Sequence, residues 1–167
     1  MKHSTFIKIG HILAQESKCI SKKVGVVIVK DDRIISTGYN GSPKGQLNCC
    51  DKFDPLIRPD VWGRPVLGEN ELVPHLSKVG RDEHHQWSNT HEIHAELNAI
   101  VYAAKSGISI DGATMYCTLT PCANCAKVIT QSGIKRIIYD QSYDKNQDDW
   151  DKILQNAEIE VLHISEV

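Results

Sequence analysis

Apolar and polar residues follow two different rhythms along the chain, which together predict a succession of helices and strands. Helical spacing marks some segments, whereas the almost continuous apolar run 24–29 is typical of a buried strand. We expect helices over residues 4–16, 92–106, 121–132 and 148–156, and strands over 24–29, 33–39, 113–119, 135–139 and 159–164. Because strands alternate with helices after a first hairpin, the pattern favours an α/β fold with a five-stranded mixed sheet flanked by helices.

Several residues mark the ends of these elements. Ser4 is a suitable N-cap for the first helix, and Asp31 and Asp32 suit the turn between the first two strands. Gly107 and Gly133 follow two later helices, where a glycine commonly ends the last turn. The element boundaries are therefore set by local chemistry as well as by periodicity.

One long segment shows little periodicity. Residues 41–90 hold five of the six prolines, and a connection of this length within a domain is generally functional or held by another group. Cysteine and histidine residues lie toward both of its ends, so that a bound metal ion could close the loop. We expect a single domain over residues 1–167 with a variable insertion at about 52–81.

Composition narrows the class of protein. The chain has 167 residues, 41% of them apolar, and no apolar run long enough to span a bilayer. Its formal net charge of −2 does not suggest the basic face that binding to duplex DNA or tRNA requires. We therefore expect a cytoplasmic protein whose partners are neither membranes nor nucleic acids.

The six cysteines and eight histidines change this picture. In a cytoplasmic protein, cysteines serve as metal ligands or free thiols more often than as disulfides. Four histidines fall between residues 84 and 94, and two cysteines have the spacing Cys-x-x-Cys. Thiols and imidazoles together indicate a zinc protein.

The zinc ligands with the clearest pattern are His94, Cys122 and Cys125, which lie at the starts of two predicted helices. Three protein ligands leave one position for a water molecule, as in catalytic zinc sites. Glu96 stands two residues after His94 and could take a proton from this water and pass it on to a substrate. In the alternative, the site is a structural zinc knuckle with a fourth ligand and Glu96 is a solvated charge.

The pattern His-x-Glu with Pro-Cys-x-x-Cys is the signature of the zinc deaminases. Beyond it, the chain resembles the deoxycytidylate (dCMP) deaminase family, in residues 37–43, 94–100 and 132–135. Residues 17–19, 48–51 and 143–146 are similar in particular to the enzymes of T-even bacteriophages. The resemblance covers nearly the whole chain except about residues 52–81.

The resemblance implies a three-layer, cytidine-deaminase-like fold and a hydrolase that converts dCMP and water into dUMP and ammonia. Such an enzyme supplies dUMP for dTMP synthesis, in the host cytoplasm if the protein is viral. Family members are typically hexamers that dCTP activates and dTTP inhibits, with magnesium accompanying the nucleotide effector. Tyr102 and Lys105 are candidates for a contact between subunits.

The phage-type resemblance also implies a second, structural zinc ion, held by Cys19, Cys49, His84 and Glu92. This agrees with the long loop that a metal ion could close. The sequence leaves two alternatives open. The neighbouring Cys50, His85 and His91 could replace members of this set, or Cys19 and Cys49 could be buried free thiols.

Residues that would contact the substrate are less distinctive. Asn40 could bond to the ribose or base, or simply form a turn, and together with Gly41 it could contact the effector. By resemblance, the backbone N–H of Ala95 contacts the base. Lys22 could meet the 5′-phosphate or be solvated, and Tyr143 could stack on the pyrimidine or pack internally.

Two rival functions remain at this point. The first is another zinc deaminase, acting on cytidine nucleosides or on adenosine in tRNA. The second is a zinc-binding module without catalysis. Only the enzymes require Glu96, so that this residue discriminates between the two classes of function.

Overall fold

The computed structural model describes residues 2–53, 78–143 and 149–167, and these form two compact units. The first unit comprises Met1–Ser17, Lys23–Asn40 and His94–Val167, and the second comprises Lys18–Lys22 and Gly41–Ile93. Most of the expected insertion at 52–81 lies outside the described residues. The expectation of one functional domain over the whole chain stays a prediction.

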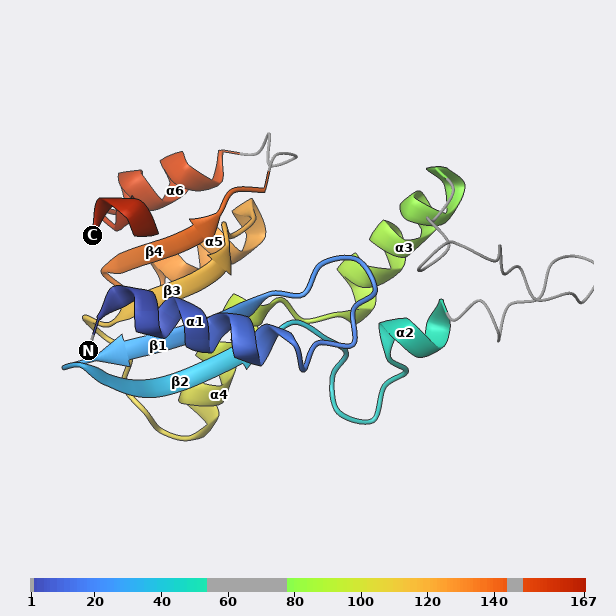
Figure 1. Ribbon diagram of the computed structural model, residues 1–167, viewed down its shortest axis with the longest axis horizontal. Helices are drawn as coiled ribbons and strands as arrows, with labels where there is room; N and C mark the ends of the chain where they lie inside the picture. The colour runs from blue at the N-terminus through green and yellow to red at the C-terminus, as the bar shows by residue number, and fades with distance from the viewer. Residues whose placement is uncertain (1, 54–77, 144–148) are drawn as a thin grey trace, which may run out of the picture. The chain divides into compact units, whose positions relative to one another are not determined.

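A five-stranded sheet forms the centre of the first unit (Figure 1). Its strands are β1 (Gly25–Lys30), β2 (Arg33–Tyr39), β3 (Thr114–Leu119), β4 (Arg136–Gln141) and β5 (Glu160–His163), in the order β2-β1-β3-β4-β5. β1 runs antiparallel to β2 and β3, whereas β3, β4 and β5 are parallel. The predicted five-stranded mixed sheet is confirmed.

Helices cover both faces of this sheet. One face packs against α1 (His3–Ala14), and the other against α4 (Ala95–Lys105), α5 (Ala123–Thr130) and α6 (Trp150–Asn156). Side chains alternate along a strand, so Val26 and Ile28 join the core of α4 to α6 while Val27 joins the core of α1. In Figure 1, α1 lies in front of the sheet and α5 behind it. The expected three-layer α/β fold is confirmed.

Several predicted boundaries of the first unit need correction. The first helix begins at His3 with Lys2 as its N-cap, so the N-cap assigned to Ser4 is wrong. The helix expected over 121–132 begins only at Ala123, because Cys122 has extended backbone angles. The last strand ends at His163, where the short 3-10 helix η1 (Ile164–Glu166) follows.

The predicted hairpin turn and the predicted glycine at the end of a helix are confirmed. Asp31 and Asp32 have φ angles of 49° and 59°, the left-handed conformation that a tight hairpin turn between β1 and β2 requires. Gly107, just after α4, has φ of 66°, as expected for a glycine that ends a helix.

Among the described residues, no helix combines the length and apolar character needed to span a bilayer.

The second unit contains two helices within the segment that was expected to be a loop, so that expectation is wrong. They are α2 (Cys49–Lys52) and α3 (Lys78–His91). Apart from Val79 and Trp87, the side chains of α3 are polar, charged or glycine, so the segment shows no apolar periodicity. Hydrophobic spacing therefore could not predict this helix.

The helix expected to begin at Glu92 begins instead at Ala95. Its start is delayed because Ile93 and Gly41 exchange backbone hydrogen bonds of 2.8 and 3.1 Å, which keeps residue 93 in a short β-bridge. Glu92 therefore belongs to the connection between α3 and α4 rather than to a helix.

Candidate active site and metal centres

The first metal-ligand cluster joins the beginnings of α4 and α5. His94 and Cys122 are the N-cap residues of these helices, both with extended backbone angles, and Cys125 lies in the first turn of α5. The His94 Nδ1 atom lies 3.5 Å from the Cys122 sulfur and 3.4 Å from the Cys125 sulfur. Nitrogen and sulfur ligands of one tetrahedral zinc ion are about 3.6 Å apart, given the usual bond lengths. The three side chains therefore fit a zinc ion.

The electrostatics of the two thiols also fit a cation. A hydrogen bond from Cys125, together with the neighbouring His94, lowers the pKa of Cys122 to about 3. The same bond and burial raise the pKa of Cys125. Without a metal ion, the pair thus shares one proton, and a bound cation would release it. The N–H groups at the start of α5 also favour the thiolate form.

Glu96 lies in the first turn of α4 and is only 4% exposed. Burial raises the pKa of its carboxyl, while the nearby His94 and Cys125 side chains act in the opposite direction. A carboxyl in this position is not the solvated helix charge of the alternative interpretation. Among the described residues, the ligand cluster itself contains His94, Cys122 and Cys125 without Glu96. This arrangement resembles a catalytic zinc site with an adjacent proton carrier.

A second cluster lies within the second unit. It consists of Cys19, Cys49, His84 and Glu92, whose ligand atoms all lie within 4.8 Å of one another. The His84 Nε2 atom is 3.1 Å from the Cys49 sulfur and 3.8 Å from the Cys19 sulfur. Four ligands from the protein are typical of a structural zinc site.

The surroundings of this cluster favour negatively charged sulfur. A hydrogen bond from Cys49 lowers the pKa of Cys19 to about 5, and the backbone N–H groups of Ser21 and Lys22 contribute as well. The Ile20 N–H points to the Cys49 sulfur at 3.5 Å. Such donors stabilise a thiolate and leave its other lone pairs for a metal ion.

Glu92 provides a more specific test of metal binding. Burial raises the pKa of this carboxyl. Its Oε2 atom accepts a hydrogen bond from the Ser88 hydroxyl, whereas Oε1 is buried without a hydrogen-bond partner among the described residues. A buried oxygen without a partner is costly, and a metal ion would satisfy it. The four side chains therefore fit a second zinc ion.

The alternative ligands lie elsewhere in the second unit. His91 is exposed, stacks on Trp87 with ring centres 4.9 Å apart and bonds to its carbonyl oxygen. His85 is exposed and bonds to Asn89 in the next turn of α3. Cys50 is oriented toward the neighbouring Asp51 carboxylate, at 3.5 Å.

The predicted substrate and effector residues occupy varied positions. Asn40 is buried, and its Oδ1 atom accepts a hydrogen bond of 2.8 Å from the Val24 N–H. Ala95 is fully buried as the first residue of α4. A Cβ atom placed on Gly41 would meet no atom of the described residues within 4 Å, so packing against these residues does not require a glycine there.

Lys22 and Tyr143 lie in different units. Lys22 is exposed in the second unit, and its backbone approaches the Cys19 sulfur. Tyr143 is half-buried after β4, where its N–H donates to the Thr120 hydroxyl at 3.0 Å. The structure brings the residues of each cluster together within one unit, whereas the predicted substrate and effector residues are divided between the two units.

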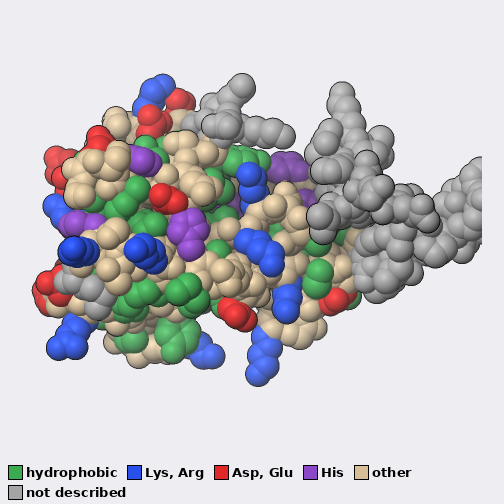
Figure 2. Space-filling view, in the orientation of Figure 1, with side chains coloured by type: hydrophobic (Ala, Val, Ile, Leu, Met, Phe, Trp, Pro, Cys, Tyr) green, Lys and Arg blue, Asp and Glu red, His purple; other side chains and the backbone are tan. Residues whose placement is uncertain are grey.

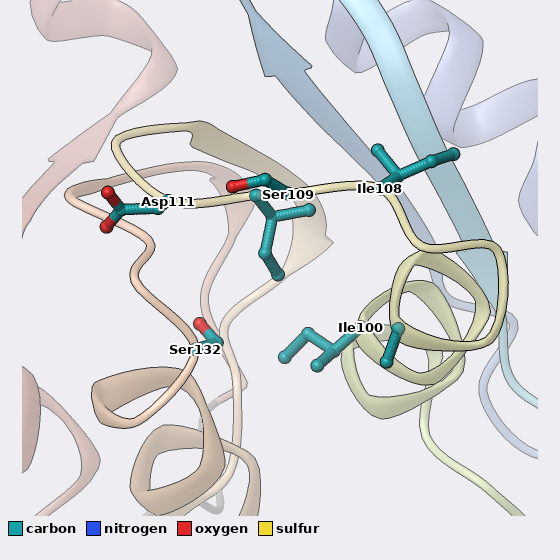
Figure 3. A pocket seen from close by; sticks show the side chains of 7 residues that line it. Ile100, Ile108, Ser109, Asp111 and Ser132 are labelled. Atoms are coloured by element: carbon teal, nitrogen blue, oxygen red, sulfur yellow. The ribbon is translucent and has the colours of Figure 1, made fainter.

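Three residues at the contact between β2 and the first turns of α4 were not predicted from the sequence, namely Ser36 and Gly38 of β2 and Asn98 of α4. Gly38 and Asn98 lie within the segments that carry the family resemblance, which was the available signal. A separate, mainly apolar pocket of about 310 Å³ lies beside the end of α4 (Figure 3). Ile100, Ile108, Asp111 and Ser132 are among its lining residues, and none of the predicted site residues lines it.

Comparison with known proteins places these clusters in context. Residues 1–141 match the family model of the cytidine and deoxycytidylate deaminase zinc-binding region. The chain is 51% identical to the deoxycytidylate deaminase of Enterobacteria phage T4, over 98% of this chain and 90% of that protein. It is 33% identical to the deoxycytidylate deaminase of Saccharomyces cerevisiae, over 97% of this chain and 44% of the yeast protein.

Solved structures give the same answer. The apo dCMP deaminase of cyanophage S-TIM5 is 30% identical to this chain and superposes with a TM-score of 0.69, covering 96% of this chain and 95% of that one. The same enzyme in complex with dCMP and dUMP gives a TM-score of 0.67 and covers 96% and 94% of the two chains. The resemblance inferred from sequence motifs and the cytidine-deaminase-like fold are thereby confirmed. The chain belongs to the cytidine and deoxycytidylate deaminase family.

Proposed function

We propose that the protein catalyses the zinc-dependent hydrolysis of dCMP to dUMP and ammonia, and so supplies dUMP for dTMP synthesis. One observation carries the proposal: His94, Cys122 and Cys125 converge at coordination distances, with the buried Glu96 beside them. The relatives named deoxycytidylate deaminase, and the cyanophage enzyme in complex with dCMP and dUMP, support the choice of substrate.

The chemistry divides between the metal ion and the chain. When bound, zinc supplies a Lewis acid that makes a water molecule nucleophilic near neutral pH. Glu96 accepts a proton from this water as its oxygen bonds to C4 of the cytosine ring, and it donates that proton to N3. It then transfers the second proton to the amino group, which leaves as ammonia as the C4–N bond breaks. The carboxyl suits both steps because it is a base when ionised and an acid when protonated.

The contacts to the rest of the nucleotide are part of the proposal. Asn40 contacts the ribose or the base of the nucleotide, and the hydrogen bond that its side-chain oxygen accepts from the Val24 N–H orients it. The N–H of Ala95 serves the base, Tyr143 stacks on the pyrimidine, and Lys22 attracts the 5′-phosphate. Substitution of each residue followed by measurement of KM for dCMP tests these assignments separately.

The second cluster holds a structural zinc ion in this proposal. Four protein ligands leave no position for a reacting water molecule. Among the described residues of the second unit, the buried apolar cluster consists of Cys19, Cys49 and Phe53, two of them being ligands. So small a core needs a metal ion for stability. Elemental analysis is expected to find two zinc ions per chain.

Regulation and assembly complete the proposal. In this proposal, dCTP with magnesium activates the enzyme and dTTP inhibits it. Both effectors bind at a site that includes Asn40 and Gly41. The active form is a homo-oligomer, expected to be a hexamer. The open space at the Cα of Gly41 supports close approach of a ligand. Val101 and Tyr102 on α4 are 52% and 55% exposed, which supports a contact between subunits near Lys105.

Substrate comparison tests the proposed function. Turnover is measured with dCMP, deoxycytidine and an RNA hairpin that contains adenosine. We expect dCMP to be preferred over the RNA hairpin. Binding of RNA requires a mainly basic surface, whereas basic and acidic side chains are interspersed on the face seen in Figure 2. Preference for deoxycytidine or for the hairpin would favour another zinc deaminase, and inactivity on all three would favour a zinc-binding module. We propose the cytoplasm, that of the host for a viral enzyme, as the site of action.

A further inference from the structure

We propose that Gly38 is a positioning residue for the deamination reaction: by lacking a side chain, it seats the first turn of α4 against β2 and thereby sets the location of Glu96. This inference rests on the proposed function, since it assigns Gly38 to that reaction. It concerns the β2–α4 contact, by which we mean residues 36–39 of β2 together with residues 95–99 of α4.

Space, not backbone conformation, requires glycine at residue 38. Its φ angle lies outside the positive range that other residues avoid. A Cβ atom built on Gly38 would, however, lie 2.3 Å from the Ala95 carbonyl oxygen and 2.6 Å from the Ala99 nitrogen. Both are backbone atoms within a helix and cannot rotate away as a flexible side chain could. Any larger residue must therefore push α4 away from β2.

The atoms that alanine at residue 38 would displace belong to the beginning of α4, which carries Glu96. The Ala95 carbonyl forms the peptide bond that leads into Glu96. Real Cβ atoms essentially never approach a neighbour below 3.0 Å, so alanine at residue 38 would require a shift of roughly 0.7 Å or more. Proton transfer needs heavy atoms about 2.6–3.2 Å apart, and a misplacement of about 1 Å can reduce the rate about 100-fold.

Two hydrogen bonds hold the same contact from either side. The Ser36 hydroxyl donates to the Ala99 carbonyl at 2.7 Å, and the Asn98 side-chain amide donates to the Tyr39 carbonyl at 2.9 Å. Ser36 is only 4% exposed, so its bond is shielded from water. These bonds keep α4 from rotating or sliding on the surface that Gly38 provides.

The β2–α4 contact also links two parts of the proposed site. β2 ends at Tyr39, immediately before the proposed substrate contact Asn40, and α4 carries Glu96 in its first turn. The contact therefore sets the distance between a group that holds the nucleotide and the group that moves its protons. A loosened contact is expected to lower kcat more than it raises KM.

Gly25 offers a matched control on the other face of the sheet. A Cβ atom on Gly25 would lie 2.0 Å from the Gly10 carbonyl oxygen of α1, an overlap of the same kind. None of the proposed catalytic or binding residues lies on α1. Gly25→Ala is therefore expected to reduce stability while the folded fraction retains its kcat.

The experiment measures kcat and KM for dCMP, bound zinc and the free energy of unfolding in wild type, Gly38→Ala and Gly25→Ala. We expect Gly38→Ala to keep both zinc ions and to lower kcat about 10- to 100-fold per folded molecule, with KM changed less than about threefold. Should Gly38→Ala not fold, Ser36→Ala and Asn98→Ala remove the flanking bonds without a clash. Each of these is then expected to lower kcat roughly three- to tenfold.

Three results would overturn the inference. The first is a wild-type kcat in folded Gly38→Ala, or in both flanking variants. The second is an equal loss of kcat in Gly25→Ala, which would indicate a general structural effect. The third is loss of zinc from Gly38→Ala, which would place the effect on His94 rather than Glu96. Turnover of dCMP by the wild type distinguishes failure of this inference from failure of the proposed function, because an inactive wild type would overturn both.

Discussion

Glu92 and His94 belong to different ligand clusters, yet a single residue separates them in the chain. That residue, Ile93, is held by two backbone hydrogen bonds to Gly41. A metal ion on Glu92 would therefore fix the chain immediately before the N-cap of α4. Because only Ile93 lies between Glu92 and His94, a metal ion at the second cluster is expected to influence metal binding at the first. His94 can coordinate a metal ion only if its backbone is correctly placed.

This relationship predicts coupling between the two metal ions. Cys49→Ser removes a ligand of the second cluster, and we expect the zinc content to fall from two ions per chain to one. Because Glu92 is then less firmly held, zinc at the remaining site is expected to bind about fivefold or more weakly. Competition with a chromophoric chelator measures this affinity. Cys50→Ser is the matched control, and an unchanged affinity in Cys49→Ser would contradict the coupling.

Tyr116 predicts a particular pH dependence of stability. Its side chain is buried against α1, and burial raises the pKa of its hydroxyl. The folded state then binds the phenolic proton more tightly than the unfolded chain, in which tyrosine titrates near about pH 10. The stabilisation is present below that pH and is lost as the pH rises through the higher pKa of the folded state.

Urea unfolding at several pH values between about 8.5 and 11 tests this expectation. The free energy of unfolding of wild type should fall more steeply above about pH 10 than that of Tyr116→Phe. The phenylalanine retains the ring that packs on Phe6, with ring centres 4.8 Å apart in wild type. Other titrating groups are common to both proteins, so that parallel curves would show that Tyr116 does not titrate differently in the folded state.

Gly41 allows the effector site to be tested with little structural cost. The velocity of wild type against dCMP is expected to be sigmoidal and to become hyperbolic with dCTP and magnesium. Gly41→Ala should fold as wild type does, because the added Cβ atom meets no described residue within 4 Å, but it should respond more weakly to dCTP. A hyperbolic wild-type curve that neither dCTP nor dTTP alters would contradict the proposed regulation and leave the proposed chemistry intact.

Local patterns in the sequence predicted the sheet and the grouping of His94 with Cys122 and Cys125, whereas the second grouping came from the family resemblance. Apolar runs specified the strands, and the starts of two helices carried His94, Cys122 and Cys125. Successive helices of an α/β unit begin at the same end of the sheet, so the starts of these two helices can bring their side chains close together. Residue type, spacing and topology were sufficient for this part of the structure.

Other features depend on contacts between residues distant in sequence, so local patterns could not reveal them. The helix α3 lacks an apolar stripe, and its His84 side chain meets cysteines that lie 35 and 65 residues away. The role of Gly38 depends on how closely β2 approaches α4, a distance that no local pattern specifies. Likewise, the delayed start of α4 results from a bridge between Gly41 and Ile93.

The most direct test of the proposed chemistry is turnover of dCMP by Glu96→Gln, measured together with its zinc content. We predict that this variant binds zinc as wild type does, because Glu96 is not among the ligands of either cluster, and that its kcat falls about 100-fold or more. Glu16→Gln, which alters an exposed carboxyl after α1, should remain fully active. Undiminished deamination by Glu96→Gln, or release of its catalytic zinc, would contradict the account.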